Sequence, residues 1–169
     1  MKEADKPTVL IVDDEANIRF LLKMVVERAG MKLVGMAATG AAAITYYRRY
    51  KPDLVLMDID MPMKSGLDAL AELIDAHPEA KVIMMSAYVD EEVVKKCFKL
   101  GAVNFILKVT PIEQIQKIMQ EVARTVSEQK KLEEPEEPET QEEPETQEEA
   151  DKPEEAEQPK ESEKPGETT

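Results

Sequence analysis

The sequence has very little cysteine and histidine, and it has no long apolar run. Cys97 is the only cysteine, so no disulfide can form within the chain, and a reducing cytoplasm is favoured. The first six residues include no apolar signal segment, and no run approaches membrane-spanning length. His77 is the only histidine and precedes Pro78 in a predicted turn, so we expect a surface residue and not an internal phosphohistidine. We therefore expect a cytoplasmic protein without membrane insertion.

The sequence also has no excess of basic residues, and its excess of acidic residues is concentrated in one C-terminal segment. The formal net charge is −14, from 22 Lys and Arg against 36 Asp and Glu. Residues 132–169 hold 17 of the acidic and 3 of the basic residues, so residues 1–131 hold 19 of each sign and are neutral. Because nucleic acids bind to basic surfaces, we expect no nucleic-acid binding.

The acidic segment has a low-complexity sequence, in which EEPETQ at residues 136–141 is repeated at 142–147. Such a segment buries too little apolar surface to offset its ordering entropy. We therefore predict a disordered Glu- and Pro-rich tail at 131–169, a folded domain at 7–130 and a flexible arm at 1–6. The tail is interpreted either as a solubilising extension or as an acidic arm that meets a basic partner.

Strand and helix patterns alternate through the folded part. Apolar, β-branched runs predict five strands, at residues 8–12, 32–36, 54–57, 81–85 and 103–107. Apolar residues at helical spacing predict a helix after each strand, with Thr39, Asp90 and Thr110 as N-caps, Pro111 at the first position of the last helix, and fraying near Gln129. The pattern predicts a doubly wound α/β fold, a (βα)5 three-layer sandwich with a parallel five-stranded sheet of order 2-1-3-4-5, the flavodoxin-like arrangement.

Aspartate, serine and lysine residues lie at the ends of four of these predicted strands. The run at 54–57 stops on Asp58, and the carboxyl ends of parallel strands meet at the edge where open α/β sheets bind ligands. Asp13 and Asp14 follow the first predicted strand, Ser86 ends the fourth, and Lys108 ends the fifth. In the predicted order, these strands and the strand that ends on Asp58 are consecutive neighbours. Five residues from distant parts of the chain are therefore expected to converge on one site. The aspartate pair alone would fit an ordinary helix N-cap, but its register with Asp58 and Lys108 favours an acidic pocket.

Clustered carboxylates raise each other's pKa values unless a cation lies among them. Oxygen ligands in small number suit Mg²⁺, and a carboxylate beside Mg²⁺ can act as a nucleophile on phosphorus. A lysine and a serine hydroxyl at the rim can then hold the phosphoryl oxygens.

These residues resemble a known family, the receiver domains of two-component response regulators. The resemblance covers roughly residues 7–128 and depends on the order and spacing of several short motifs. The matching segments are 11–15 (IVDDE), 57–62 (MDIDMP) with Gly66, 86–87 (SA), 101–102 (GA), and Phe105 with Lys108.

The resemblance implies that Asp58 accepts a phosphoryl group from a histidine kinase or phosphotransfer protein. It implies a Mg²⁺ site formed by Asp14, Asp58 and the Asp60 backbone carbonyl, with Asp13 acting mostly through bound water. Ser86 and Phe105 are implied to be a switch pair, although Phe105 also fits a plain core residue. The fourth helix, fifth strand and fifth helix are implied to form the face that binds a downstream protein partner.

The resemblance thus predicts a stand-alone regulator, with no second folded domain after residue 131, that is a phosphoacceptor able to lose its own phosphoryl group and not an enzyme. The family usually has proline directly after the lysine, whereas this chain has Val109; we expect a trans peptide bond there and an altered loop. Asp60 and Tyr88 occupy positions that tune phosphoryl lifetime in the family. Two alternatives stay open: a pseudo-receiver that binds partners without phosphorylation, and a phosphatase with an aspartyl nucleophile.

Overall fold

The structure, a computed structural model, describes residues 6–133. The predicted arm, apart from Lys6, and the predicted tail, apart from residues 131–133, lie outside the described residues.

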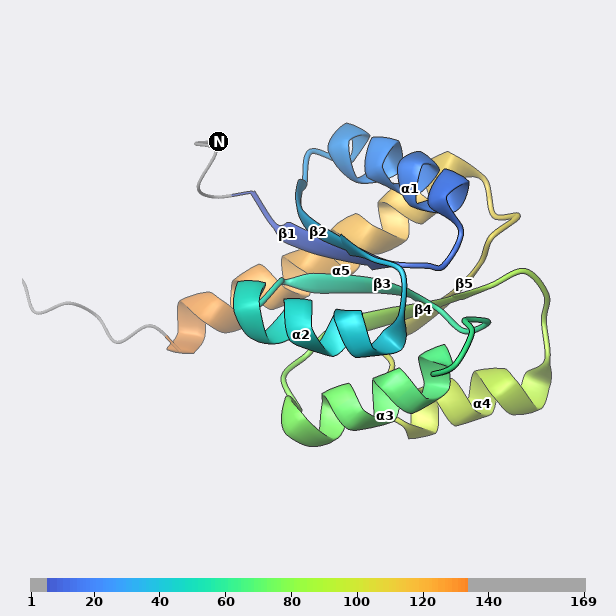
Figure 1. The fold of residues 1–169 in the computed structure, drawn as a ribbon. Helices are drawn as coiled ribbons and strands as arrows, with labels where there is room; N and C mark the ends of the chain where they lie inside the picture. The colour runs from blue at the N-terminus through green and yellow to red at the C-terminus, as the bar shows by residue number, and fades with distance from the viewer. Residues whose placement is uncertain (1–5, 134–169) are drawn as a thin grey trace, which may run out of the picture. The chain divides into compact units, whose positions relative to one another are not determined.

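Five strands alternate with five helices in the described part of the chain (Figure 1). The strands are β1 (Thr8–Val12), β2 (Lys32–Ala37), β3 (Leu54–Asp58), β4 (Val82–Ser86) and β5 (Asn104–Leu107). The helices are α1 (Ala16–Arg28), α2 (Gly40–Tyr50), α3 (Gly66–Ala76), α4 (Glu91–Lys99) and α5 (Ile112–Glu133). Each strand agrees with the predicted one to within one residue at either end.

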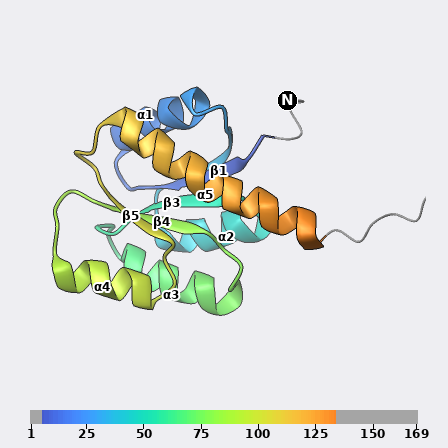
Figure 2. The same ribbon diagram turned by 180° about the vertical axis from the view of Figure 1, so that it is seen from behind.

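The strands form one parallel sheet of order β2-β1-β3-β4-β5. Helices α1 and α5 cover one face, and α2, α3 and α4 cover the other, as the two opposite views show (Figures 1 and 2). The predicted doubly wound fold and its strand order are therefore confirmed.

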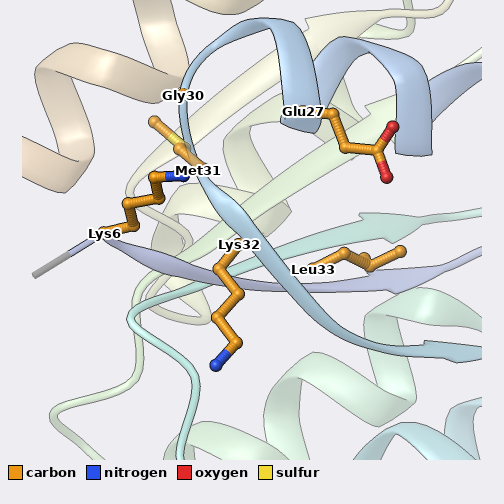
Figure 3. Close-up of a pocket in the computed structure, with 6 residues that line it drawn as sticks. All are labelled: Lys6, Glu27, Gly30, Met31, Lys32 and Leu33. Atoms are coloured by element: carbon orange, nitrogen blue, oxygen red, sulfur yellow. The ribbon is translucent and has the colours of Figure 1, made fainter. Parts of the chain in front are cut away.

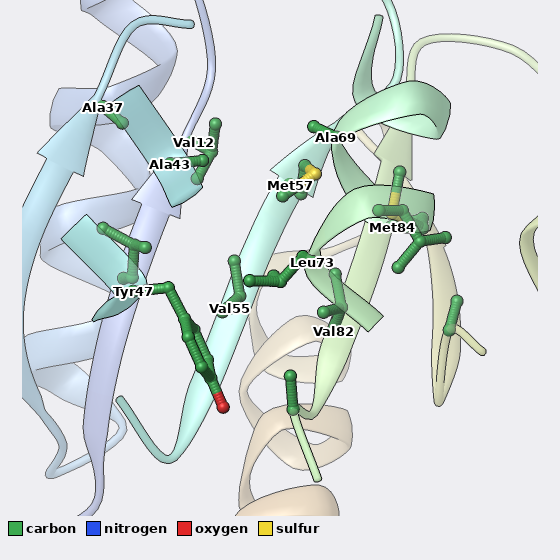
Figure 4. Close-up of a cluster of buried hydrophobic side chains, with 14 of the residues drawn as sticks. Val12, Ala37, Ala43, Tyr47, Val55, Met57, Ala69, Leu73, Val82 and Met84 are labelled. Carbon is green, nitrogen blue, oxygen red and sulfur yellow. The ribbon is translucent and has the colours of Figure 1, made fainter. Parts of the chain in front are cut away.

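Each face of the sheet has its own hydrophobic cluster, because side chains on a strand alternate between the two faces. On β3, Val55 and Met57 pack with Tyr47 of α2 and Leu73 of α3 (Figure 4). Leu56, between them, belongs to the cluster under α1 and α5. Both clusters consist of side chains that are almost completely buried, each contributing about 1.5–3 kcal/mol for a residue the size of Leu or Met. The sheet is thus packed tightly on both sides and gives a rigid base to the residues at its edge.

Side-chain caps fix where three of the helices begin. The Thr39 hydroxyl accepts from the Ala42 N–H at 3.2 Å, and Asp90 Oδ1 accepts from the Glu92 and Val93 N–H groups at 2.9 and 3.1 Å, as predicted. Ser65 caps α3 in the same manner.

The two ends of α5 differ from the prediction. The Pro111 carbonyl accepts from the N–H groups of Gln114 and Ile115, so Pro111 occupies the capping position that was expected for Thr110. The helix then continues to Glu133, beyond the predicted fraying point at Gln129. The last turns are composed of Glu, Gln, Lys and Leu, all of which have high helix propensity.

His77 was expected at the surface, but its side chain is only 16% exposed. Its ring packs on Tyr47 with 5.0 Å between the centroids. Burial raises the pKa of Tyr47 to about 12, with a further contribution from the charges of Glu79 and Asp53. Cys97 of α4 is fully buried, as its position on the apolar side of that helix predicts.

Among residues 6–133, no helix combines the length and the apolar character that a membrane span requires.

Candidate functional site

At the carboxyl ends of the strands, the alternation of side chains places Asp13, Asp58 and Lys108 on the same face of the sheet. Each of them stands two residues after a side chain of the cluster under α1 and α5. Those three cluster residues are Ile11, Leu56 and Ile106. Because the side-chain period of a strand is two residues, the acids and the lysine inherit the direction of these core side chains. The predicted convergence therefore follows directly from the register of β1, β3 and β5.

The lysine lies between two buried carboxylates. Lys108 Nζ is 2.8 Å from Asp13 Oδ2 and 3.0 Å from Asp58 Oδ1. The side chains of Asp13, Asp58 and Lys108 are only 1%, 2% and 13% exposed, so these charges interact with little screening by solvent. Val109, which replaces the usual proline, is exposed and does not prevent Lys108 from reaching both acids.

The backbone of the next strand holds the lysine in place. The Lys108 N–H donates to the Ser86 carbonyl at 2.7 Å, which extends the β4–β5 pairing by one residue. The Thr110 N–H donates to the Leu107 carbonyl at 2.9 Å and closes a turn around Lys108 and Val109.

A divalent cation fits the acidic cluster. Asp13, Asp14 and Asp58 each offer a carboxylate oxygen, and these oxygens lie within 4.8 Å of one another. Asp13 Oδ2 and Asp58 Oδ1 are buried, and within residues 6–133 both contact the Lys108 ammonium as ion pairs. Three carboxylates against one ammonium leave an excess of two negative charges. Hard oxygen donors with that charge suit Mg²⁺.

The pKa values of Asp58 and Lys108, the two ionisable groups at the centre of the site, are both raised. Burial raises the pKa of Asp58, Lys108 opposes this shift, and the charges of Asp13 and Asp60 add to it. For Lys108, burial disfavours the ammonium, but Asp13 and Asp58 outweigh that effect and the pKa is raised. The lysine is therefore held protonated, while the ionised form of Asp58 is disfavoured. An added cation beside Asp58 would favour its ionised, nucleophilic form.

Ser86 and Phe105 lie on the opposite face of the sheet from Asp13, Asp58 and Lys108. Ser86 is two residues after Met84, and Met84 belongs to the cluster under α2, α3 and α4. Phe105, which pairs with Met84 in the β4–β5 register, is half-buried and packs against the same cluster. The Ser86 hydroxyl is buried and accepts from the Tyr88 N–H at 3.3 Å. The structure thus places both predicted switch residues on the same face of the sheet, with Ser86 two residues beyond Met84, the partner of Phe105.

The predicted site residue Asp60 is exposed, and its carboxylate contacts Tyr88. The Tyr88 hydroxyl donates to Asp60 Oδ1 at 3.4 Å, so these two positions, distant in sequence, are in contact. Neither this contact nor a role for Glu15 was predicted from the sequence, although Glu15 belongs to the matching segment 11–15; its carboxylate lies 3.9 Å from Lys108 Nζ. Glu15 directly follows the aspartate pair, and that adjacency was the signal that could have identified it.

Gly66 at the start of α3 packs directly on the backbone of Asp58. A Cβ atom there would lie 1.9 Å from the Asp58 carbonyl oxygen and 2.8 Å from the Ile59 Cα. Only glycine allows this approach, and the Gly66 N–H uses it to donate to the Ile59 carbonyl at 2.9 Å. The loop after β3 is therefore held against α3 at the position of the central acid.

A cavity of about 300 Å³ lies at the other edge of the sheet. It is lined by Lys6, Glu27, Gly30, Met31, Lys32 and Leu33 (Figure 3). Lys32 starts β2 and pairs with Thr8 at the start of β1, so this cavity is at the amino ends of the strands. It is separate from the acid cluster, which is at their carboxyl ends.

Comparison with known proteins agrees with this site. Residues 9–120 match the response regulator receiver domain family. The chain is 43% identical over 100 residues to the chemotaxis protein CheY of Thermotoga maritima, covering 59% of this chain and 83% of the relative. It is 39% identical over 118 residues to the protein CcdB of Bacillus subtilis, covering 70% of this chain and 96% of the relative.

Solved structures show the same similarity. The crystal structure of the CheX-CheY-BeF3-Mg complex from Borrelia burgdorferi is matched with a TM-score of 0.66 and 31% identity, over 69% of this chain and 88% of that one. The response regulator domain of Thermotoga maritima CheB is matched with a TM-score of 0.63 and 33% identity, over 73% and 97%. With the fold, the acidic pocket and these matches in agreement, the chain belongs to the response regulator receiver domain family of two-component systems.

Proposed function

We propose that this protein is a phosphorylation-dependent switch in which Asp58 accepts a phosphoryl group from a histidine kinase or phosphotransfer protein. The observation that supports this most is the acid cluster itself, with Lys108 within 3.0 Å of both Asp13 and Asp58. A structural ion pair would need only one acid per lysine, whereas this arrangement leaves excess negative charge directly beside a buried carboxylate.

Different residues of the chain would have different roles in the phosphoryl transfer. An Asp58 carboxylate oxygen attacks the phosphorus of a phosphohistidine; the new O–P bond forms as the P–N bond breaks, and the donor imidazole leaves after taking up a proton. Lys108 remains protonated and can move its ammonium from the carboxylates to a phosphoryl oxygen. Asp14 and Asp58 would hold Mg²⁺ with the Asp60 backbone carbonyl, and Asp13 would act through water.

Bound Mg²⁺ would neutralise the developing negative charge on the transferred group. The protein acts here as an acceptor that can lose its phosphoryl group to water.

The signal would leave the site through Ser86 and Phe105. When the Ser86 hydroxyl turns to a phosphoryl oxygen, it gives up its contact with the Tyr88 N–H and vacates space at the end of β4. Phe105 is half-buried on the same face and can move inward toward that space. This movement would change the surface of α4, β5 and α5, where Phe98 of α4 is 49% exposed and Val103, directly before β5, is 37% exposed. We propose that a protein partner binds there and that its affinity depends on phosphorylation.

Incubation with Mg²⁺ and acetyl phosphate tests the transfer. The intact mass of the wild type should rise by one phosphoryl group, and Asp58→Asn should show no rise. No gain in the wild type with either acetyl phosphate or a cognate kinase would favour the pseudo-receiver, and an equal gain in the variant would place the acceptor elsewhere. Sustained hydrolysis of a phosphomonoester would favour the phosphatase.

The output face has its own test. Protein captured on the beryllofluoride form but not on the resting form should be lost with Phe98→Ser. Phe20→Ser is the matched control, because Phe20 is 62% exposed on α1, which is not one of the elements of the α4–β5–α5 face. Equal losses with both variants would contradict a specific role for the α4–β5–α5 face.

A further inference from the structure

The loop that carries Asp13 and Asp14 is held by an arginine from the helix that follows it. Arg19 Nη1 donates to the Asp13 carbonyl at 2.7 Å and to the Asp14 carbonyl at 2.9 Å. Arg19 lies one turn into α1, and its own N–H donates to the Glu15 carbonyl at 3.0 Å. One guanidinium nitrogen therefore bridges two consecutive peptide groups of the loop.

This loop lacks the side-chain cap that the starts of α2, α3 and α4 have. Glu15 stands at the N-cap of α1 without a side-chain cap hydrogen bond, whereas Thr39, Ser65 and Asp90 cap α2, α3 and α4. Besides the bridge from Arg19, the loop has a bond from the Glu15 N–H to Asp13 Oδ1 at 2.9 Å and one from the Asp13 N–H to the Ala37 carbonyl. The Asp14 carbonyl is thus fixed by Arg19.

We propose that Arg19 is a positioning residue that holds Asp13 and Asp14 in a cation-binding arrangement before the cation arrives. The proposal assumes the Mg²⁺ site of the proposed function. Fixing the carbonyls of residues 13 and 14 fixes the peptide planes on both sides of Asp14 and so the direction of its carboxylate. Hydrogen bonds from a charged donor are about twice as strong as neutral ones, so they can offset part of the repulsion between the clustered acids.

The bridge and the charge of Arg19 have opposite effects on Mg²⁺. A cation that acted only through its charge would repel Mg²⁺, and its removal would tighten binding. A residue that orients ligands strengthens binding, and loss of such supporting groups typically costs about 10–100-fold in metal affinity. The sign of the change therefore separates the two roles.

The experiment is a calorimetric titration of the full chain with Mg²⁺. Arg19→Met should weaken binding roughly tenfold, at the lower end of the range for supporting groups. Arg19→Lys keeps the charge and one possible donor, so it should fall between the wild type and Arg19→Met. Arg28→Met is the matched control, since Arg28 is exposed in the last turn of the same helix and should bind Mg²⁺ as the wild type does.

Amide hydrogen exchange of the metal-free protein provides a second measurement. The Glu15 amide should exchange faster in Arg19→Met than in Arg28→Met, because its acceptor Asp13 Oδ1 is less well placed. Unchanged or tighter Mg²⁺ binding by Arg19→Met would overturn the proposal, as would equal exchange of the Glu15 amide in the two variants. A wild type that binds no Mg²⁺ would contradict the proposed metal site, and the exchange rates would still decide whether Arg19 holds the loop.

Discussion

Replacement of Gly66 by alanine tests how the fold positions Asp58. The added Cβ would lie 1.9 Å from the Asp58 carbonyl oxygen, whereas ordinary contacts begin at 3.4 Å, so the two backbones must separate by 1.5 Å. Asp58 ends a fully buried strand and Gly66 begins a helix, so neither can move without disturbing the packing of its own element. Overpacking usually costs about 1–3 kcal/mol, and we expect at least 3 kcal/mol here because the clash involves backbone on both sides.

The assay is urea unfolding, followed by Mg²⁺ titration of the folded variant. Gly30→Ala is the matched control: a Cβ there meets nothing within 4 Å, and only the positive φ of +76° is strained. That strain costs about 1–2 kcal/mol for a non-glycine residue. Gly66→Ala should also weaken Mg²⁺ binding, whereas Gly30→Ala should not. A Gly66→Ala protein as stable as Gly30→Ala, with wild-type Mg²⁺ affinity, would refute the argument that this close approach positions Asp58.

Three further variants follow from the same structure. Asp58→Asn should raise Tm without Mg²⁺, because burial raises the folded-state pKa of Asp58 and so disfavours its ionised form. The gain in Tm should be absent below the usual pKa of the carboxyl, grow as pH rises from that value through the raised pKa, and stay constant above it. A gain that does not depend on pH would contradict this. Leu73→Ala removes a fully buried side chain between the sheet and α3 and should cost about 2–5 kcal/mol in urea unfolding; a cost under 1 kcal/mol would contradict the packing described for that face. Thr39→Ala removes the cap of α2 and should cost about 1 kcal/mol, with Thr125→Ala on the exposed side of α5 as a near-neutral control.

Sequence periodicity was sufficient to predict the fold and the central site. The apolar runs predicted each strand, and the residues directly after them, Asp13, Asp58 and Lys108, meet because parallel strands end at one edge. Strand alternation also explains why Ser86 and Phe105 share the opposite face. These features depend on local pattern and on a small set of sheet topologies, both of which can be read from the chain.

Other contacts had no such signal. Arg19 reaches back to the loop through a long side chain, and Tyr88 meets Asp60 across two loops, so neither contact follows from a repeat or a spacing. His77 was misplaced because its turn sequence indicates exposure, whereas the ring of Tyr47 covers it in the fold. The start of α5 shifted by one residue because Thr110 and Pro111 both suit a helix start, and the turn closed by the Thr110 N–H decides between them.

We propose that Asp58 forms an aspartyl phosphate when Mg²⁺ is present. Borohydride reduction converts such an acyl phosphate to homoserine, so peptide mapping after treatment with acetyl phosphate locates the acceptor directly. We expect homoserine at position 58 in the presence of Mg²⁺, and aspartate there when Mg²⁺ is removed by chelation. Homoserine at another acidic position, or an unchanged Asp58 under both conditions, would contradict the claim.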